Sequence, residues 1–121
     1  MTWRVEGTEV FEGWFASLTE AEREDVIAVV DLLKALGPRL GSPQTSKING
    51  SRHGHMRELR IQHAGRPYRV LYAFDPQRTA ILLVGGDKTG NGRWYQQMIT
   101  LADRLYDEHL NELREHEKER H

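Results

Sequence analysis

The chain of 121 residues contains no cysteine. Disulfide bonds and thiolate zinc sites are therefore excluded, and nothing implies an oxidising compartment. Long apolar runs are also missing, because the longest, near residues 26–36 and 80–84, are too short or too interrupted to cross a bilayer. No stretch has the pattern of a signal peptide, an internal repeat or an interdomain linker. We therefore expect a single cytoplasmic domain over residues 1–121, without a membrane partner, in which a solvated tail frays from about residue 114.

Several motifs of catalysis and cofactor binding are absent as well. Ser17, Ser46 and Ser51 have no His and Asp partners in the arrangement of a hydrolase triad. Residues 85–89 resemble part of a phosphate loop but lack its upstream glycine and spacing. His53 and His55 form a His-x-His pair, but no third ligand stands at a suitable spacing. We expect neither a metal nor any other cofactor.

Positive charge is concentrated in the middle of the chain. Residues 47–93 carry nine basic and three acidic side chains, a net charge of +6. The segments before and after have net charges of −4 and −3, which together give the formal −1 of the whole chain. A local positive potential attracts phosphates whatever the overall net charge. The alternative is that arginines are simply common on exposed strand faces.

The pattern of apolar residues predicts a small α+β domain with the order β-α-α-β-β-β-α. A short strand at 3–5 precedes a helix at 8–17, and the capping box Thr19–Glu22 begins a second helix that ends before Gly37-Pro38. Residues 39–55 are rich in loops, with a brief extension at 47–48. Three strands follow within residues 56–88, and a last helix extends from Arg93 to about Leu113. Two N-terminal helices and a C-terminal helix would thus cover an antiparallel sheet.

The first hairpin of this sheet places two arginines opposite each other. If Ala64 and Gly65 form a two-residue turn, His63 pairs with Arg66 and Arg60 faces Arg69. Like charges directly opposite destabilise a sheet, so the pair predicts an anion between them. An odd-length loop would reverse this relation.

A second turn at residues 75–78 would place Arg69 opposite Val84 and Lys88 on the same side as the arginines. The same register predicts an apolar group on the arginine face, formed by Leu71, Ala73, Ala80, Leu82 and Val84. So much apolar surface needs a cover. Either the last helix or a segment of a partner could provide it.

The ordered motifs of the chain resemble toxins of the RelE/ParE superfamily, specifically its phage-derived HigB-like branch. The resemblance covers nearly the whole chain. It is carried by Lys47-Ile48, residues 50–60, residues 68–74, Ile81-Leu82-Leu83, residues 86–89, Trp94-Tyr95 and residues 102–106.

The resemblance implies a RelE-like fold and the toxin half of a type II toxin–antitoxin module. RelE- and HigB-like members cleave messenger RNA, usually in the ribosomal decoding site, whereas ParE-like members of the same fold poison DNA gyrase. The implied partners are a cognate helix-turn-helix antitoxin, messenger RNA and the ribosome. Operator DNA would be contacted only through the antitoxin complex. Three hypotheses therefore stand: a metal-independent endoribonuclease that inhibits translation, a gyrase inhibitor, and a non-enzymatic binding module.

Cleavage of RNA without a metal needs a proton acceptor for the 2′-hydroxyl, positive charge at the phosphorane-like transition state, and a proton donor for the leaving oxygen. We assign the charge to Arg60 and Arg69, because a guanidinium fork suits phosphate. Lys88 could contact phosphate or carry a proton, and the resemblance places Arg69, Lys88 and Tyr95 where RelE-like enzymes carry functional residues. The candidate RNA-binding residues are Lys47, Arg52, His55, Arg66 and Arg93.

Three of the four catalytic candidates have a structural alternative. Arg60 could pair with Glu58 or with an acidic residue of the last helix, Lys88 could pair with Asp87, and Tyr95 could belong to the core. Residue types alone leave the general base and the general acid unidentified.

Overall fold

The computed structural model describes residues 2–119, and in it threonine side chains begin both N-terminal helices. Helix α1 (Glu9–Ser17) begins at Thr8, whose hydroxyl accepts a hydrogen bond from the Phe11 amide. Helix α2 (Glu20–Leu36) begins at Thr19, which forms the predicted capping box with Glu22. After α2 the chain turns at Gly37, whose φ of 56° favours glycine, into the 3₁₀ helix η1 (Gly37–Arg39).

The hairpin of strands β3 (Arg57–His63) and β4 (Arg66–Phe74) has the predicted register. Ala64 and Gly65 form its turn with φ of 51° and 77°, the positive values that a two-residue turn with the twist of a hairpin requires. His63 faces Arg66, and Arg60 faces Arg69. Directly opposed side chains share a face, so both arginines project from the same side of the sheet.

Strand β5 (Ala80–Asp87) pairs antiparallel with β4, but one residue away from the predicted register near the turn and two residues away at Arg69. Arg69 faces Gly86, so the prediction that it faces Val84 is wrong. One reason is that the turn is longer than expected, since the amide of Asp75 donates to the carbonyl of Thr79. The other is a register shift between Leu71 and Tyr72 that leaves one residue of β5 as a bulge.

The bulge redistributes the apolar residues of β5 between the two faces. Leu83 and Val84 both pack in the core beneath the last helix, while Ala80 and Leu82 pack in the core on the other side. The expectation that Ala80 and Leu82 share the arginine face is therefore wrong. Gly86 faces Arg69, and Lys88 has the parity of Gly86, so the predicted side for Lys88 is retained.

Short strands form the two edges of the five-stranded sheet, whose order is β1-β5-β4-β3-β2. Strand β1 (Val5–Gly7) pairs in parallel with β5, whereas every other pairing is antiparallel. Strand β2 (Thr45–Lys47) pairs with β3 and lies two residues earlier than the brief extension expected at 47–48. The α+β class is confirmed, with this edge strand added to the predicted order.

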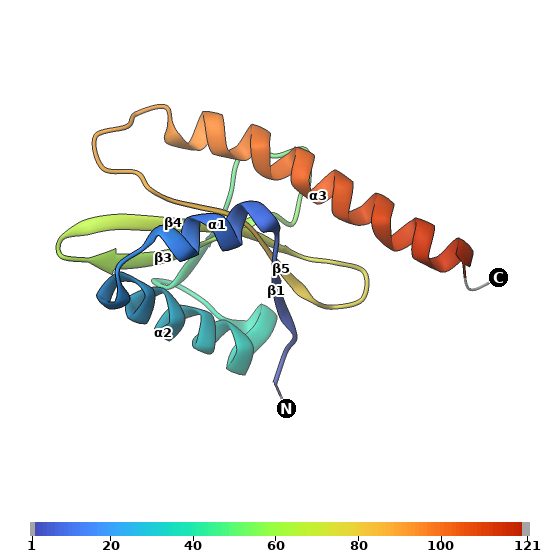
Figure 1. Ribbon diagram of the computed structural model, residues 1–121, viewed down its shortest axis with the longest axis horizontal. Coiled ribbons are helices and arrows are strands. Elements are labelled where there is room, and N and C mark those ends of the chain that lie inside the picture. The colour runs from blue at the N-terminus through green and yellow to red at the C-terminus, as the bar shows by residue number, and fades with distance from the viewer. Residues whose placement is uncertain (1, 120–121) are drawn as a thin grey trace.

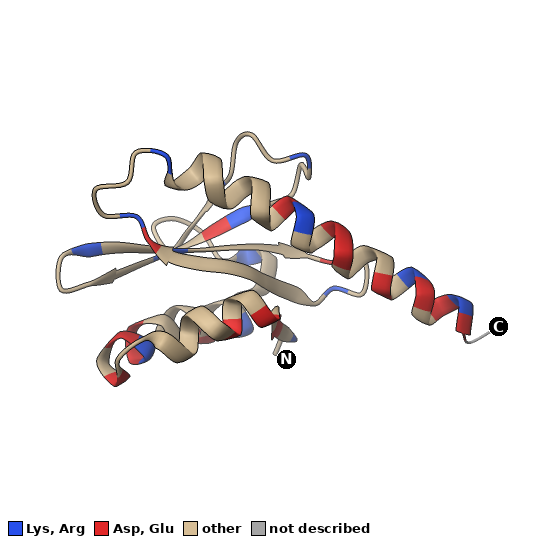
Figure 2. Cartoon of the chain, turned by 45° about the horizontal axis from the view of Figure 1, so that its top comes forward, with Lys and Arg blue, Asp and Glu red and all other residues tan. Residues whose placement is uncertain are grey.

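Helices cover both faces of the sheet (Figures 1 and 2). Helix α3 (Trp94–Glu119) lies over one face, where Leu71, Ala73 and Ile81 form a core with its buried residues. Helices α1 and α2 lie over the opposite face. The last helix of this chain therefore covers Leu71, Ala73 and Val84 of the apolar group that the sequence left without an assigned cover, whereas α1 and α2 cover Ala80 and Leu82.

Helix α3 is longer than predicted. The sequence predicted that the helix ends at about Leu113, whereas residues 114–119 are helical. Fraying of the tail from about residue 114 stays a prediction, and residues 120–121 lie outside the described part of the chain. Within residues 2–119, none of the helices combines the length and the apolar character needed to span a membrane.

Candidate nucleic-acid interface

A buried arginine–glutamate pair lies where β3, β4 and the first turn of α3 meet. Arg69 Nε is 2.9 Å from Glu58 Oε1, and each side chain is only 6% exposed. Arg69 Nη1 also donates to the carbonyl of Tyr68 at 3.0 Å. Glu58 stands opposite Leu71, so it meets Arg69 diagonally across the ladder. The guanidinium is fixed by internal contacts rather than presented to solvent.

Tyr95 joins this pair from the start of α3. Its hydroxyl donates to Glu58 Oε1 at 2.7 Å and accepts from Arg69 Nε at 3.3 Å. Burial, and then the hydrogen bond to Glu58, raises the pKa of Tyr95 above its ordinary value. The phenol is therefore protonated at neutral pH and acts as a donor.

Ser46 on β2 completes the surroundings of the carboxylate by donating to Glu58 Oε2 at 3.0 Å. Both carboxylate oxygens of Glu58 are thus hydrogen-bonded. A buried ion pair offsets its desolvation cost only when the remaining polar atoms are also satisfied, and Ser46 and Tyr95 meet that condition.

Arg60 differs from Arg69 although the two stand opposite each other. Its side chain is exposed, and none of the hydrogen bonds or ion pairs among residues 2–119 holds its guanidinium. Glu58, one of the partners considered for Arg60, binds Arg69 instead. The opposed arginines predicted that an external anion lies between them. Glu58 instead supplies this negative charge from within the protein.

Lys88 lies against the ring of Tyr95, with Nζ 5.3 Å from the ring centroid. Its amide donates to the carbonyl of Pro67, which attaches the residue to the start of β4. Asp87, the partner considered for Lys88 in the structural alternative, instead contacts Arg66 and Thr89. In the part of the chain that the structure describes, the Lys88 ammonium makes a cation–π contact and no ion pair.

Gly85 and Gly86 leave space in which two tryptophan rings pack against the sheet. A Cβ on Gly85 would lie 2.2 Å from the ring of Trp14, and a Cβ on Gly86 would lie 2.6 Å from Trp94 Nε1. Both residues are in β5, where successive side-chain positions point to opposite faces. The absence of a side chain at these two positions lets α1 and α3 lie close to the sheet.

Two of the predicted RNA-binding residues form ion pairs with carboxylates of the protein itself. Arg52 Nη2 is 2.6 Å from Asp107 of α3. Arg66 lies 3.6 Å from Glu22 and 3.4 Å from Asp87, and its guanidinium lies over the ring of Tyr68. Neither residue joins the cluster of Arg69, Glu58 and Tyr95.

The other three predicted RNA-binding residues, Lys47, His55 and Arg93, are exposed. Lys47 is on β2 and Arg93 directly precedes α3. The structure therefore gathers Arg60, Arg69, Lys88 and Tyr95 on the α3 side of the sheet, but it does not bring the predicted RNA-binding residues together around them.

Histidines elsewhere in the chain bind carboxylates. His53 meets Asp107 at 2.8 Å and His63 meets Asp25 at 2.6 Å. His109 of α3 is mostly buried and lies 2.8 Å from Asp75. Within residues 2–119 no three His, Asp or Glu side chains are grouped so that they could hold a metal ion.

Sequence reasoning missed Glu58 and Ser46 as members of the site. A signal for Glu58 was present, because the predicted register already placed it on the same face as Arg60 and Arg69. Ser46 gave none, because its role depends on β2, which the sequence did not delimit.

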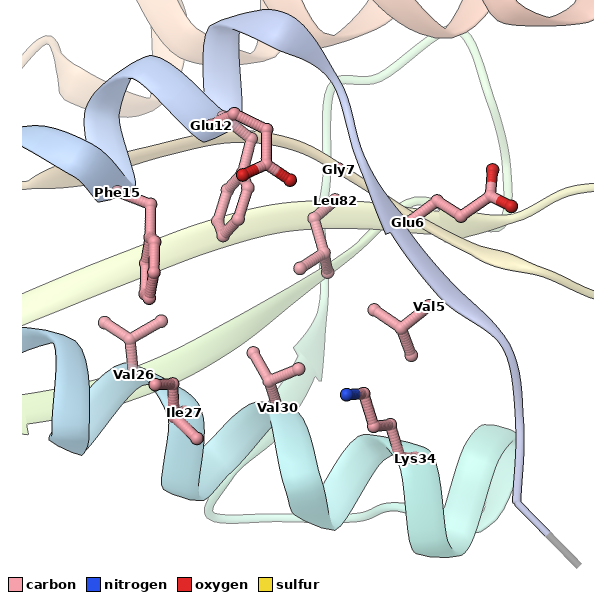
Figure 3. A pocket seen from close by; sticks show the side chains of 11 residues that line it. Val5, Glu6, Gly7, Glu12, Phe15, Val26, Ile27, Val30, Lys34 and Leu82 are labelled. Carbon is pink, nitrogen blue, oxygen red and sulfur yellow. The ribbon is translucent and has the colours of Figure 1, made fainter.

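A separate hollow of about 230 Å³ lies on the other side of the sheet, between α1 and α2 (Figure 3). Phe15, Val30 and Leu82 give it an apolar lining, with Glu12 and Lys34 among its polar residues. It contains none of the predicted site residues, and its apolar walls do not suit a phosphate.

Comparison with known proteins decides the family. The family model described as "Phage derived protein Gp49-like (DUF891)" matches residues 13–107. The chain belongs to this family. It is also 48% identical over 93 residues to "Putative toxin HigB3" of Mycobacterium tuberculosis, covering 76% of this chain and 80% of that protein. The proposed superfamily, with its HigB-like branch, is confirmed by these matches.

A second relative and two solved structures agree with this membership. "Putative toxin HigB2" of the same organism is 41% identical over 104 residues, covering 84% of this chain but only 52% of that longer protein. The RelE–RelB complex of Pyrococcus horikoshii OT3 matches 74% of this chain and 99% of that chain, with a TM-score of 0.55 and 20% identity. A mutant of the E. coli toxin RelE in the free state matches 78% of this chain and 92% of that chain, with a TM-score of 0.58 and 14% identity. At these identities the two structures establish the RelE-like fold of this Gp49-like chain.

Proposed function

We propose that the chain is the toxin of a type II toxin–antitoxin module and that it cleaves messenger RNA without a metal, in the cytoplasm and in association with the ribosome. The observation that carries this proposal is a group of complementary side chains on one face of the sheet. Two cations that no carboxylate among residues 2–119 holds, Arg60 and Lys88, flank a carboxylate and a phenol that lie in hydrogen-bond contact.

Each requirement of the reaction has a candidate within this group. Glu58 is the candidate acceptor for the 2′-hydroxyl proton, and Tyr95, with its raised pKa, is the candidate donor to the leaving oxygen. Arg60 and Lys88 can approach the phosphate from solvent. Arg69 then holds Glu58 in place and adds positive charge from within the protein. This division differs from the sequence-based assignment, in which Arg60 and Arg69 bind the phosphate equally.

Arg60→Ala and Lys88→Ala test this assignment. Each should lower the rate of RNA cleavage by about 100-fold, as loss of a positioned donor at a developing anion does. Both side chains lie outside the cores, so unfolding temperatures should be nearly unchanged. Cleavage is measured by mapping RNA ends on translated messenger RNA, with EDTA present and with ribosomes either added or omitted.

Arg114→Ala is the matched control, because Arg114 is an exposed arginine of α3 far along the helix from Tyr95. Arg69→Ala is a poor test, since it would leave Glu58 buried without its charge partner and would destabilise the fold. Intact RNA together with broken DNA in the presence of gyrase would favour the gyrase hypothesis. Binding without turnover would favour a binding module.

A partner antitoxin of the helix-turn-helix class is part of the proposal. Its support is the structural likeness to a RelE solved together with RelB. Coexpression with the product of an adjacent gene should give a stable complex and restore growth. Operator DNA should bind that complex and not the chain alone.

A further inference from the structure

A second group of basic residues lies on the opposite side of the sheet from Arg60. It lines a hollow of about 470 Å³ at the β2 edge, formed by Pro38, Lys47, Gly54, His55, Arg57 and Phe74. Arg57 faces Lys47 on one side and Tyr72 on the other. Because Tyr72 packs in the core beneath α1 and α2, this hollow opens on the α2 side. It is therefore distinct from the Arg69 cluster.

The basic residues of this hollow are not neutralised by the protein. No carboxylate lines it, and among residues 2–119 neither Lys47, His55 nor Arg57 takes part in an ion pair. The nearest polar contact of Arg57 is a hydrogen bond from Nε to the Thr45 hydroxyl at 3.4 Å, which leaves its charge unbalanced. Arg52, Arg66 and Arg69, in contrast, all meet carboxylates.

An aromatic ring stands beside these cations. Phe74 makes edge contacts with Trp3 and Tyr72, with centroid distances of 5.6 and 6.0 Å, which fix the ring at the wall of the hollow. Pro38 adds a second apolar surface. Cations beside an aromatic ring are the combination by which proteins hold single-stranded nucleic acid, the cations on phosphate and the ring on a base.

The position of the hollow suits a strand that also reaches the proposed cleavage site. Arg57 and Arg60 are three residues apart on β3, or about 10 Å at the rise of a β-strand. The side chains of Arg57 and Arg60 point to opposite faces of the sheet. The edge between these faces is the strand β2, which has only three residues. A flexible polynucleotide can pass around such a short edge.

We propose that Lys47, Arg57, His55 and Phe74 form a second RNA-binding subsite that holds a nucleotide of the single strand away from the reacting phosphate. The proposal rests on the proposed function in taking RNA as the ligand. It does not depend on cleavage. An acidic or phosphorylated protein segment is the competing occupant, and the experiment distinguishes the two.

The probe is a fluorescein-labelled single-stranded 2′-O-methyl RNA, which cannot be cleaved through its 2′-oxygen. Binding is followed by fluorescence anisotropy over a series of salt concentrations. The double variant Lys47→Gln/Arg57→Gln should raise the Kd severalfold. It should also lower the slope of log affinity against log salt by about 0.7 for each phosphate that the variant no longer neutralises. Arg114→Gln, which removes one exposed charge far along α3, should change neither quantity.

Lys47→Gln alone serves as a second variant if the double variant loses thermal stability, because Lys47 is exposed. An unchanged Kd and salt slope in the variants would overturn the subsite, as would a wild-type chain that does not bind the RNA. Polyglutamate, added at the same total charge as the RNA, would point to an acidic protein partner instead if it displaces the RNA from the wild-type chain but not from the variants. RNA binding that depends on Lys47 and Arg57 in a chain without cleavage activity would retain the subsite and reject the proposed nuclease.

Discussion

Arg60 and Arg69 stand opposite each other on the sheet, but only Arg69 is buried against a carboxylate. The pairing of Arg60 with Arg69 followed from a two-residue turn and was predicted correctly. The diagonal contact of Arg69 with Glu58 could not be predicted with the same ease, because it depends on rotamer choice and on burial beneath α3. Strand register follows from backbone pairing, whereas the partner that a charged side chain meets is decided by side-chain packing.

The contact between Glu22 and Tyr68 gives a prediction at this scale. A hydrogen bond from Tyr68, followed by those from Thr19, lowers the pKa of Glu22 from about 4.5 to about 2. A lowered folded-state pKa stabilises the protein above pH 4.5, and the contribution is lost as the pH falls from 4.5 toward 2. Glu22→Gln should therefore lower the unfolding temperature at neutral pH, and the difference from wild type should shrink below pH 4.5. Thermal unfolding followed by circular dichroism across this range measures it.

Asp31→Asn is the control for this experiment, since Asp31 is an exposed carboxylate of the same helix outside the hydrogen bonds and ion pairs among residues 2–119. It should show no such convergence with pH. A Glu22→Gln deficit that stays constant down to pH 2 would contradict the assigned pKa.

At the scale of elements, helix ends and the first hairpin were predictable and the path of β5 was not. Capping residues and turn glycines act locally, so Thr19 and Gly65 could be interpreted from their neighbours. The bulge in β5 and the long turn at 75–79 arise from the fit of the strand between two cores, which a single-strand pattern does not contain. For the edge strand β2 the sequence predicted only a brief extension at 47–48, because three residues are too few for a periodic signal.

The paired glycines of β5 give the prediction for this scale. Gly86→Ala would place a Cβ 2.6 Å from Trp94 Nε1, so the start of α3 must move. We expect a loss of about 1–3 kcal/mol in the free energy of unfolding, as for other overpacked cores. RNA cleavage should fall as well, because Tyr95 adjoins Trp94. Urea denaturation measures the first quantity, and the RNA-end assay measures the second.

Gly92→Ala is the matched control, because a Cβ at Gly92 would meet nothing within 4 Å. Stability losses of equal size in Gly86→Ala and Gly92→Ala would show that contact with Trp94 is not responsible, because replacing a glycine that has room for a Cβ should leave stability unchanged or raise it.

Across the whole molecule, carboxylates balance part of the positive charge of residues 47–93, so fewer of its cations are free to bind an anion than the net charge suggests. The sequence assigns +6 to residues 47–93, but Arg52, Arg66 and Arg69 meet carboxylates, two of them from α2 or α3. Figure 2 shows acidic positions gathered at the start of α2 and along α3, which are the elements that supply those carboxylates. Composition could therefore predict an anion-binding domain, but not which cations face solvent. That distinction separates Arg60, Lys88 and the β2-edge residues from Arg52, Arg66 and Arg69.

The arrangement of two cores on either side of one sheet leads to a last prediction. Leu33 of α2 is fully buried on one side, and Ile99 of α3 is 9% exposed on the other. Leu33→Ala should cost about 2–5 kcal/mol and Ile99→Val about 0.5–1.5 kcal/mol. Because the sheet separates the two side chains, the double variant should lose the sum of the two values. Strands β4 and β5 contribute to both cores, so urea unfolding should remain a single transition, with fluorescence and circular dichroism superimposable. Two resolved transitions would mean that the α1–α2 layer and the α3 layer unfold independently, and the sheet would then not act as the common support for both surfaces.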